Sequence, residues 1–337
     1  MQRYFTVSVE LEKSIRFNLE KYFHTHLEDS KKLAESVKKL SDFFIANPES
    51  PTPWKEAWAQ IAYLVYFMPL NQARVQAVVV EARRRGFFEG LDHVTDFGAG
   101  FGTASLALAE DFRNFHLVER AHEICSKYSF LPASANLKWS DKIDSLQNPD
   151  KCLSVFSYSL TELEALPSWA KKSEALMILE PSTQQDGRAL MGLRQQLIGD
   201  GYELWAPCTH QNVCPLLAQS KTDWCHDRIH FNMPKWFEQI EQHLPMKNRT
   251  LTFSYLLARR KQAPVLPPRT ARTVGDRMQE KGKDRQLICR GDAREFLAWL
   301  HKHGIDQEIP RGVLIEVPNS SQKVSNEIRL SELMKLV

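Results

Sequence analysis

Residues 96–102 form the first segment whose residue types suggest binding chemistry, with the sequence DFGAGFG. The segment follows an apolar, β-type stretch at residues 93–97 and opens into a helical pattern at residues 103–110. Glycines at such a turn let the backbone approach a ligand closely, and the start of the following helix offers free N–H groups. The pattern predicts a ligand-binding turn on Gly98, Gly100 and Gly102, and a tight turn that binds nothing is the alternative.

Two acidic residues make this prediction more specific. Asp96 precedes the first glycine of the turn by two residues, and Glu119 ends the next expected strand, 23 residues after Asp96. An acid at the end of that second strand can accept hydrogen bonds from ribose hydroxyls. A dinucleotide-binding turn would carry its third glycine at position 103, where this chain has Thr103.

The turn and its acids resemble those of the S-adenosylmethionine-dependent methyltransferases of the Rossmann-like class. The resemblance implies that the region of Asp96 receives the methionine part of the donor and that Glu119 holds its ribose. It also implies that Asp141, after the expected third strand, contacts the adenine. For Asp141 the alternative is an acid that binds no ligand.

No catalytic base can be recognised in the sequence. Residues 156–162 follow the expected fourth strand, where this class often places catalytic groups, but they lack the Asn or Asp followed by Pro-Pro and an aromatic residue that is common in amino-methylating enzymes. Pro207 and Cys208 resemble the Pro-Cys nucleophile of cytosine-5 methyltransferases, but they lie well past that strand. The catalytic residues are therefore unknown: the pattern predicts binding of the methyl donor and identifies no residue for its transfer.

Three cysteines within eighteen residues indicate a metal centre. Cys208, Cys214 and Cys225 follow one another with spacings of C-x5-C and C-x10-C. Thiolates are the ligands of structural zinc sites and of iron–sulfur clusters, and both need four ligands. A metal can order loops that have no large core of their own.

The fourth ligand must come from elsewhere in the chain. Cys289 is the best candidate, because it ends a short expected strand just before a glycine turn. His210 and His226 are the alternatives, since a zinc site with three Cys and one His is chemically reasonable. Cys125 and Cys152 are expected to be buried as small apolar residues.

The charge of the chain is unevenly distributed. Residues 247–290 contain twelve Lys and Arg against three acids, a local net charge of +9 in a chain whose sum is +3. Such asymmetry indicates a polyanionic partner, with nucleic acid as the first candidate and a solvated basic loop as the alternative. If these cations neutralise RNA phosphates, binding should weaken steeply with salt.

Hydrophobic periodicity divides the chain into three expected parts. Residues 1–90 form an N-terminal helical domain. Residues 91–260 alternate strands with helices, which predicts an α/β fold: a Rossmann-like class I methyltransferase sheet with a Cys-rich, metal-binding insertion at about 206–230. Residues 261–337 are expected to contain a basic loop at 262–283 and a small α+β extension, with a helix at 293–303 between strands at 285–289 and 312–317.

Composition excludes several other classes of protein. With 43% apolar and 25% charged residues, the chain is neither disordered nor collagen-like. Its most apolar stretch, residues 61–70, is about half the roughly 20 residues that span a membrane. The first thirty residues contain five acids and no apolar signal core, so we expect no presequence and a cytoplasmic location. In that reducing compartment, structural disulfides are not expected.

The Cys-rich segment and its flanks carry a second, more specific resemblance. Residues 180–183 read EPST, 206–210 read APCTH, 223–226 read DWCH and 253–256 read FSYL. With the methyltransferase-like part, they resemble the methyltransferase-like assembly proteins of the small ribosomal subunit in mitochondria and their bacterial relatives, over about residues 71–291. One departure is Asp227, where relatives tend to have Phe after Trp-Cys-His.

This second resemblance implies association with the RNA and proteins of the small ribosomal subunit, in its assembly or in translation. It also implies S-adenosyl-L-methionine as a ligand and a 4Fe–4S cluster on Cys208, Cys214, Cys225 and Cys289. We expect no membrane partner and a monomer off the ribosome. Two alternatives stay open: an active rRNA methyltransferase, and a zinc-stabilised methyltransferase that acts on a substrate other than RNA.

Overall fold

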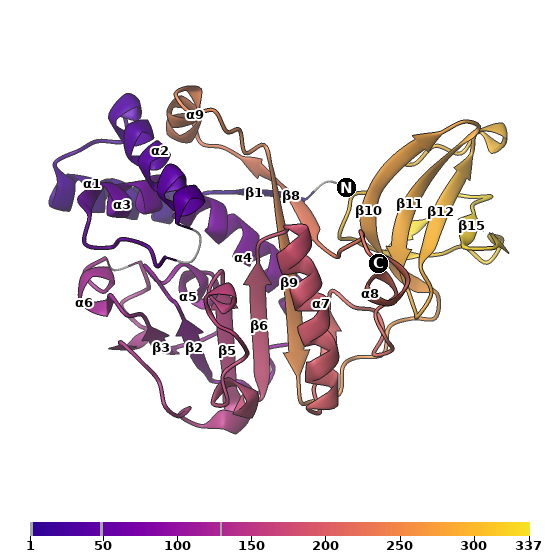
Figure 1. Ribbon diagram of the computed structural model, residues 1–337, viewed down its shortest axis with the longest axis horizontal. Coiled ribbons are helices and arrows are strands. Elements are labelled where there is room, and N and C mark those ends of the chain that lie inside the picture. Colours follow the sequence, from indigo (N-terminus) through magenta and orange to yellow (C-terminus); the bar gives the residue numbers. More distant parts are fainter. Residues whose placement is uncertain (1–2, 48–49, 129) are drawn as a thin grey trace.

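Two β-sheets organise the chain in the computed structural model, which describes residues 3–47, 50–128 and 130–337 (Figure 1). The large sheet lies in the middle of the molecule, and the smaller one is formed by the C-terminal part of the chain. Residues 1–2 and 48–49 of the predicted helical part, and residue 129 of the methyltransferase-like part, lie outside the described residues.

The large sheet has nine strands among the described residues, in the order β1-β8-β9-β6-β5-β2-β3-β4, with β7 also paired to β9. Strands β2 to β6 run parallel, whereas β9 is antiparallel to β6, β7 and β8. The strands are β1 (Tyr4–Thr6), β2 (His93–Phe97), β3 (Asn114–Val118), β4 (Asn136–Ser140), β5 (Cys152–Ser157), β6 (Ala175–Glu180), β7 (Glu203–Ala206), β8 (Asp227–Asn232) and β9 (Thr250–Arg259).

Both faces of this sheet are buried, as the near-continuous apolar strands require. Along β6, Met177 and Leu179 pack into the core beneath the N-terminal helices, whereas Leu176 and Ile178 pack against α7 on the other face. Figure 1 shows α7 in front of β6 and β9. Helices accompany the sheet as α1 (Val9–Phe23), α2 (Ser30–Ala46), α3 (Ala57–Ala62), the π-helix η1 (Tyr63–Phe67), α4 (Met68–Arg84), α5 (Thr103–Leu108), α6 (His122–Cys125), α7 (Gln184–Gly199), α8 (Pro215–Gln219) and α9 (Lys235–Gln242).

The second sheet has its own apolar core, which includes Ile288, Leu297 and Trp299. Its strand order is β14-β15-β12-β11-β10-β13-β16. The strands are β10 (Thr270–Glu280), β11 (Lys283–Cys289), β12 (Glu295–Leu300), β13 (Leu314–Glu316), β14 (Gln322–Val324), β15 (Glu327–Arg329) and β16 (Lys335–Leu336). The 3-10 turns are η2 (Pro149–Lys151), η3 (Leu160–Glu162), η4 (Ala170–Lys172) and η5 (His301–His303).

Two predictions for the C-terminal part are wrong. Residues 293–303, expected as a helix, contain strand β12 and the turn η5. The sequence did not reveal the strand because residues 295–300 pair with β11 and β15 and are almost all buried, so apolar and polar residues do not alternate there. The expected loop at residues 262–283 contains β10, whose first half is buried and whose second half is charged. This part of the chain is therefore a β-structure and not an α+β extension.

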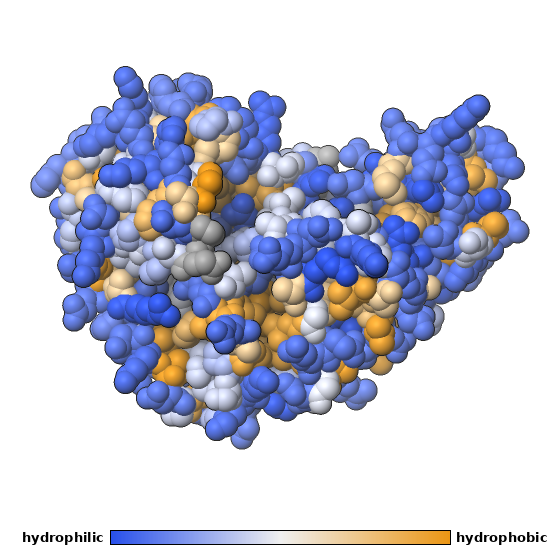
Figure 2. All heavy atoms as spheres, viewed as in Figure 1, coloured by the Kyte–Doolittle hydropathy of each residue, from blue (hydrophilic) through white to orange (hydrophobic). Residues whose placement is uncertain are grey.

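The N-terminal part also differs from a purely helical unit. Strand β1 pairs in parallel with β8 at the edge of the large sheet. Residues 4–6, expected in the helical part, therefore belong to that sheet. Helix α6, after β3, covers only four residues. Figure 2, in the same view, shows apolar side chains (orange) at the surface below the middle of this face, where Figure 1 places β5 and β6.

Candidate functional site

The glycine turn after β2 requires glycine for its backbone conformation. Gly98, Gly100 and Gly102 have positive φ angles of 68°, 51° and 78°, which residues with a side chain rarely adopt. At Gly98 there is also no room, because an added Cβ would lie 2.5 Å from the Cβ of Ser159. The segment after β5 therefore packs directly on the turn.

Asp96 holds the turn from inside the protein. It is 1% exposed, and its Oδ2 accepts hydrogen bonds from the backbone N–H of Ser105, at 3.2 Å, and from its hydroxyl, at 2.7 Å. Burial raises the pKa of Asp96 to about 6. These contacts join the end of β2 to α5, so they fix the shape of the turn.

Glu119 and Asp141 follow β3 and β4 at the same edge of the sheet as the glycine turn. The Oε2 of Glu119 accepts from the backbone N–H of Gly100 at 3.1 Å, and its Oε1 accepts from Ala121 N at 3.0 Å. Asp141 is exposed to solvent. The parallel sheet therefore brings the acids chosen from the sequence to one edge, although they are far apart in the chain.

All four cysteines predicted as metal ligands line one cavity. Cys208 follows β7, Cys214 directly precedes α8, and Cys225 precedes β8. Cys289 is the last residue of β11, so the cavity lies between the large and the small sheet. Apolar side chains complete its lining, among them Leu190, Met191, Leu216 and Val274.

Burial affects the ionisation of these thiols. It raises the pKa of Cys225 well above its usual value, and burial with the neighbouring Cys208 and Cys214 also raises the pKa of Cys289. The free thiols are therefore neutral at pH 7 at these two positions. A bound metal would change this, since it displaces the thiol protons.

A buried cation lies against the thiols. Arg194 on α7 is 1% exposed, and its Nε donates a hydrogen bond to the Sγ of Cys208 at 3.1 Å. Its other hydrogen bonds go to neutral acceptors, the carbonyl of His210 at 2.9 Å and the side chain of Gln195 at 3.3 Å. No ion pair between Arg194 and a carboxylate occurs in the described part of the chain. A buried charge needs a counter-charge, so the donor set of this cavity fits an anionic group.

The histidines considered as alternatives differ in position. The Nε2 of His210 lies 3.4 Å from the Sγ of Cys289, whereas Nε2 of His226 contacts Arg311. Burial, followed by the nearby arginine in each case, lowers the pKa of both to about 4. Within residues 3–47, 50–128 and 130–337, no group of three or more His, Cys, Asp or Glu side chains that could hold a metal ion is found. Cys125 and Cys152 are buried, as predicted.

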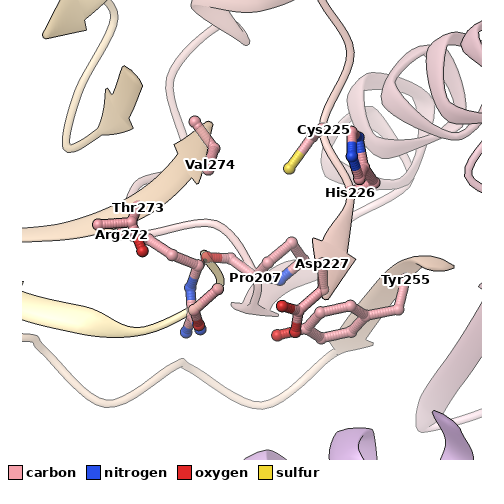
Figure 3. Close-up of a pocket in the computed structure, with 9 residues that line it drawn as sticks. Pro207, Cys225, His226, Asp227, Tyr255, Arg272, Thr273 and Val274 are labelled. Atoms are coloured by element: carbon pink, nitrogen blue, oxygen red, sulfur yellow. Dashed lines mark hydrogen bonds between the residues drawn. The ribbon is translucent and has the colours of Figure 1, made fainter. Parts of the chain in front are cut away.

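Beside the cysteine cavity lies a second, polar pocket that contains Asp227 and Arg272 (Figure 3). Arg272 on β10 is 2% exposed, donates at 2.6 Å to the carbonyls of Pro207 and Gly312, and pairs with Glu81 of α4. Asp227 is 4% exposed and pairs with Arg3. The departure from Phe at Asp227 thus has a structural reason, because this acid is the partner of an N-terminal cation.

The structure corrects the interpretation of the basic segment. With carboxylates of the described residues, seven of its twelve cations form ion pairs, and most of these carboxylates lie outside residues 247–290. These seven are Arg259, Lys261, Arg272, Arg277, Lys283, Arg285 and Arg290. The local net charge of +9 is therefore largely neutralised within the fold, and a steep salt dependence no longer follows from it.

Sheet order and turn define the class of this protein. Strands β4-β3-β2-β5-β6 are parallel, the antiparallel β9 follows, and the glycine turn lies at the carboxyl end of β2. This is a Rossmann-like class I methyltransferase sheet, as the sequence predicts. The chain belongs to the family described as mitochondrial small ribosomal subunit Rsm22, whose family model matches residues 57–297. The match includes the glycine turn and all four cysteines of the cavity.

Three solved structures to which this chain is similar are described as methyltransferases. The 23S rRNA methyltransferase ErmE is 15% identical with a TM-score of 0.31, over 56% of this chain and 70% of that chain. A putative RNA methyltransferase from Pyrococcus horikoshii is 13% identical with a TM-score of 0.30, over 68% and 96%. Magnesium protoporphyrin IX methyltransferase from Synechocystis PCC 6803 is 11% identical with a TM-score of 0.33, over 67% and 100%.

The search of curated proteins finds no match. In the described part of the chain, no helix combines the length and the apolar character that crossing a membrane would require.

Proposed function

We propose that this chain is a methyltransferase-like factor that binds small-subunit ribosomal RNA and assists assembly of that subunit or translation. The observation that carries the proposal is the family match over residues 57–297, because the family is described as part of the mitochondrial small ribosomal subunit. The RNA and proteins of that subunit are the partners, and the protein is a monomer when it is not bound to them.

Sedimentation of the purified protein with ribosomal particles tests this proposal. The protein is expected to migrate with immature small subunits and not with large subunits. Equal binding to both particles, or to neither, would contradict it. An excess of unrelated RNA in the mixture separates specific binding from general electrostatic attraction.

The glycine turn with Glu119 is proposed to bind S-adenosyl-L-methionine. The support is the positive φ of all three glycines, the exposure of Gly98, and the position of Glu119 at the end of the neighbouring strand. In the bound state Glu119 would exchange its contact with Gly100 N for the ribose hydroxyls, and Asp141 would lie toward the adenine. Asp96 would act indirectly, by holding the turn through Ser105.

We further propose that the four cysteines of the cavity hold a 4Fe–4S cluster. The support is their common cavity together with the buried Arg194, which needs an anion beside it. A cluster with four thiolates carries negative charge, and so does zinc with four thiolates, which is the alternative. When bound, the group would connect Cys289 of the small sheet to the three cysteines that follow β7.

An active rRNA methyltransferase is the second candidate function. It is favoured by the same turn, because positioning of an acceptor against the donor can supply much of the rate without a base. Transfer of a tritium-labelled methyl group to immature small subunits tests it. Incorporation that Gly100→Asp abolishes would favour catalysis, whereas donor binding without incorporation would favour the assembly role.

Two further proposals concern organisation and location. The chain is proposed to divide into parts at about residues 90 and 260, although β1 joins the first part to the large sheet. The cytoplasmic location also stays a prediction, since the family is described as mitochondrial. Fractionation of cells that express the full chain would decide between the two compartments.

A further inference from the structure

Three polar side chains near the carboxyl ends of β5 and β6 have buried atoms with no hydrogen-bond partner among the residues that the structure describes. They are Oε2 of Glu180, Oη of Tyr158 and Nε of Arg74. Glu180 is 3% exposed, and its other oxygen accepts from the backbone N–H of Leu160 at 2.9 Å. Buried polar atoms of native proteins are nearly always paired, so three of them in one region indicate a place for a polar ligand.

The three side chains face one another. The guanidinium carbon of Arg74 on α4 lies 5.8 Å from the ring centroid of Tyr158, and both Arg74 and Glu180 act electrostatically on the Tyr158 hydroxyl. Tyr158 also has a φ of 60°, although it is not glycine. Such strain is retained where the surrounding structure holds a side chain in a particular place, often at a binding site.

This cluster of Arg74, Tyr158 and Glu180 borders the glycine turn. Ser159, the neighbour of Tyr158, is the residue that leaves no room for a Cβ at Gly98. Arg74 is linked to the glycine turn by a second route. Its Nη1 donates to Oδ1 of Asn71 at 2.8 Å, and Asn71 lies beside the hydroxyl of Tyr63. That hydroxyl is close to Gly100, since a Cβ added there would lie 3.6 Å from it. A ligand on the turn can therefore extend into the cluster.

We propose that this cluster binds the amino-carboxylate end of the methyl donor, with Arg74 holding the carboxylate and Glu180 the ammonium group. The proposal rests on donor binding under the proposed function and assigns a different set of residues to that end of the donor. Arginine and carboxylate are complementary to the two charges of an amino acid, and Tyr158 can donate to the same carboxylate. Asp96, to which the family resemblance gives this role, is already occupied by Ser105.

Binding of this group should release a proton. The pKa of Glu180 is raised to about 8, chiefly by burial and also by the charge of Asp186, against the lowering effect of the backbone N–H of Leu160 and of Thr161. Glu180 is therefore mostly neutral at pH 7 without ligand. An ammonium group beside it favours the carboxylate, so the proton leaves to the buffer as the donor binds.

Calorimetry on the full chain tests the proposal with two probes. S-adenosylhomocysteine has the amino-carboxylate end, and 5′-methylthioadenosine lacks it. Glu180→Gln and Arg74→Gln should each weaken S-adenosylhomocysteine binding by about tenfold or more, the loss of one charged hydrogen bond. Binding of 5′-methylthioadenosine should stay within about twofold, because the variants remove nothing that it contacts. Matched controls are Arg84→Gln on the exposed side of α4 and Glu164→Gln, which is also exposed.

Proton release gives a readout that a purely structural role would not change. In buffers of different ionisation enthalpy at pH 7, the wild type should release a proton on binding S-adenosylhomocysteine, and Glu180→Gln should not. Equal weakening of both probes, unchanged affinity in both variants, or no proton release would overturn the proposal. A wild type that binds neither probe would also overturn it. Co-sedimentation with small subunits tests the ribosomal role separately, so that result would not be affected.

Discussion

At the residue scale, Arg194 is the side chain that says most about the contents of the cysteine cavity. It is buried, it donates to Cys208, and its other acceptors are neutral. Burial opposes its charge, but the thiols of Cys208, Cys214 and Cys289 raise its pKa. The cation thus lies where it would balance the anionic group proposed for those same sulfurs.

Replacing this cation should have opposite effects with and without the cluster. We expect Arg194→Met to shorten the lifetime of the cluster in air by about tenfold, because one charged hydrogen bond is lost. In iron-free protein the same variant should raise the free energy of unfolding by about 1–3 kcal/mol, because it removes a buried charge without a partner. Absorbance decay and urea unfolding measure the two effects, with Arg194→Lys as the variant that keeps the charge. A less stable iron-free variant with unchanged cluster lifetime would contradict this account.

Glu180 should make the stability of the protein depend on pH. Its pKa rises from 4.5 to about 8 on folding, so the folded state holds the proton more tightly than the unfolded state. Protonated Glu180 therefore contributes to the free energy of unfolding fully below about pH 4.5. This contribution, on the order of a few kcal/mol, is lost as the pH rises toward about 8. Urea unfolding of ligand-free protein at pH 5, 7 and 9 measures the loss. Glu180→Gln should flatten the profile, and an unchanged profile would contradict the assignment.

The sequence predicts residues well where their neighbours in the chain carry the signal. Cys289 was identifiable because it ends a strand before a glycine turn, and it does line the cavity with the other three cysteines. Arg194 and Glu180 were missed, because nothing near them in the sequence reveals burial without a partner. The sequence offered one indication for Glu180: it is the first residue of the EPST segment at 180–183, which is part of the family resemblance.

At the element scale, the contact between α7 and the Cys-rich segment is close enough to require glycine. A Cβ at Gly187 would lie 2.6 Å from Cδ1 of Trp224, the residue before Cys225. The indole of Trp224 is held on its other side by a 2.7 Å hydrogen bond to the carbonyl of Ser182. Helix α7 therefore positions a cysteine through the ring beside it.

Two glycines on α7 offer a matched pair of variants. Gly187→Ala should displace Trp224, lower the iron content and reduce the free energy of unfolding by about 1–3 kcal/mol, the usual cost of overpacking. Gly192→Ala meets nothing within 4 Å, so it should raise stability by about 0.5–1 kcal/mol through better helix propensity. Thermal unfolding and iron analysis of both variants check this. Equal effects of the two substitutions would show that the packing of α7 on Trp224 is unimportant.

Helices and strands could be predicted from the sequence where the spacing of apolar residues follows a single helical or strand period. Short apolar runs that alternate with helical patterns predict the strands of the parallel sheet. Strand β12 was missed because both of its faces are buried, so its sequence does not alternate. Strand β10 was missed because the cations in it suggested a loop, although Arg277 and Arg272 are neutralised by carboxylates that only the fold brings near.

At the scale of the whole molecule, two sites hold the sheets together. Arg272 joins β10 to α4 through Glu81, and the cysteine cavity is lined by Cys289 of β11 and by three cysteines of the segment between β7 and β8. Burial opposes ionisation of Glu81, but the charge of Arg272 lowers its pKa. We therefore expect the position of the small sheet to depend on this buried ion pair and on the group proposed for the four cysteines.

Internal pairing of the basic segment has a consequence for RNA binding. Five cations of residues 247–290 form no ion pair with the described residues: Lys247, Arg249, Arg260, Arg269 and Lys281. If only these five contact phosphates, a plot of the logarithm of the binding constant against the logarithm of the salt concentration should have a slope of about −4 to −5. Twelve free cations would give a slope of about −11. Affinity for small-subunit RNA at several salt concentrations measures the slope. A value near the steeper figure would mean that these ion pairs open on binding.

Metal and sulfide analysis of the full chain, purified without oxygen, tests the central proposal most directly. Four iron and four sulfide per chain are expected, with a brown colour, since that is the composition of a 4Fe–4S cluster. Cys289→Ser should lose iron as completely as Cys208→Ser, whereas Cys152→Ala should keep it, because Cys152 lies outside the cavity. A colourless protein with one zinc per chain, or full iron content in Cys289→Ser, would contradict a cluster that joins the two sheets.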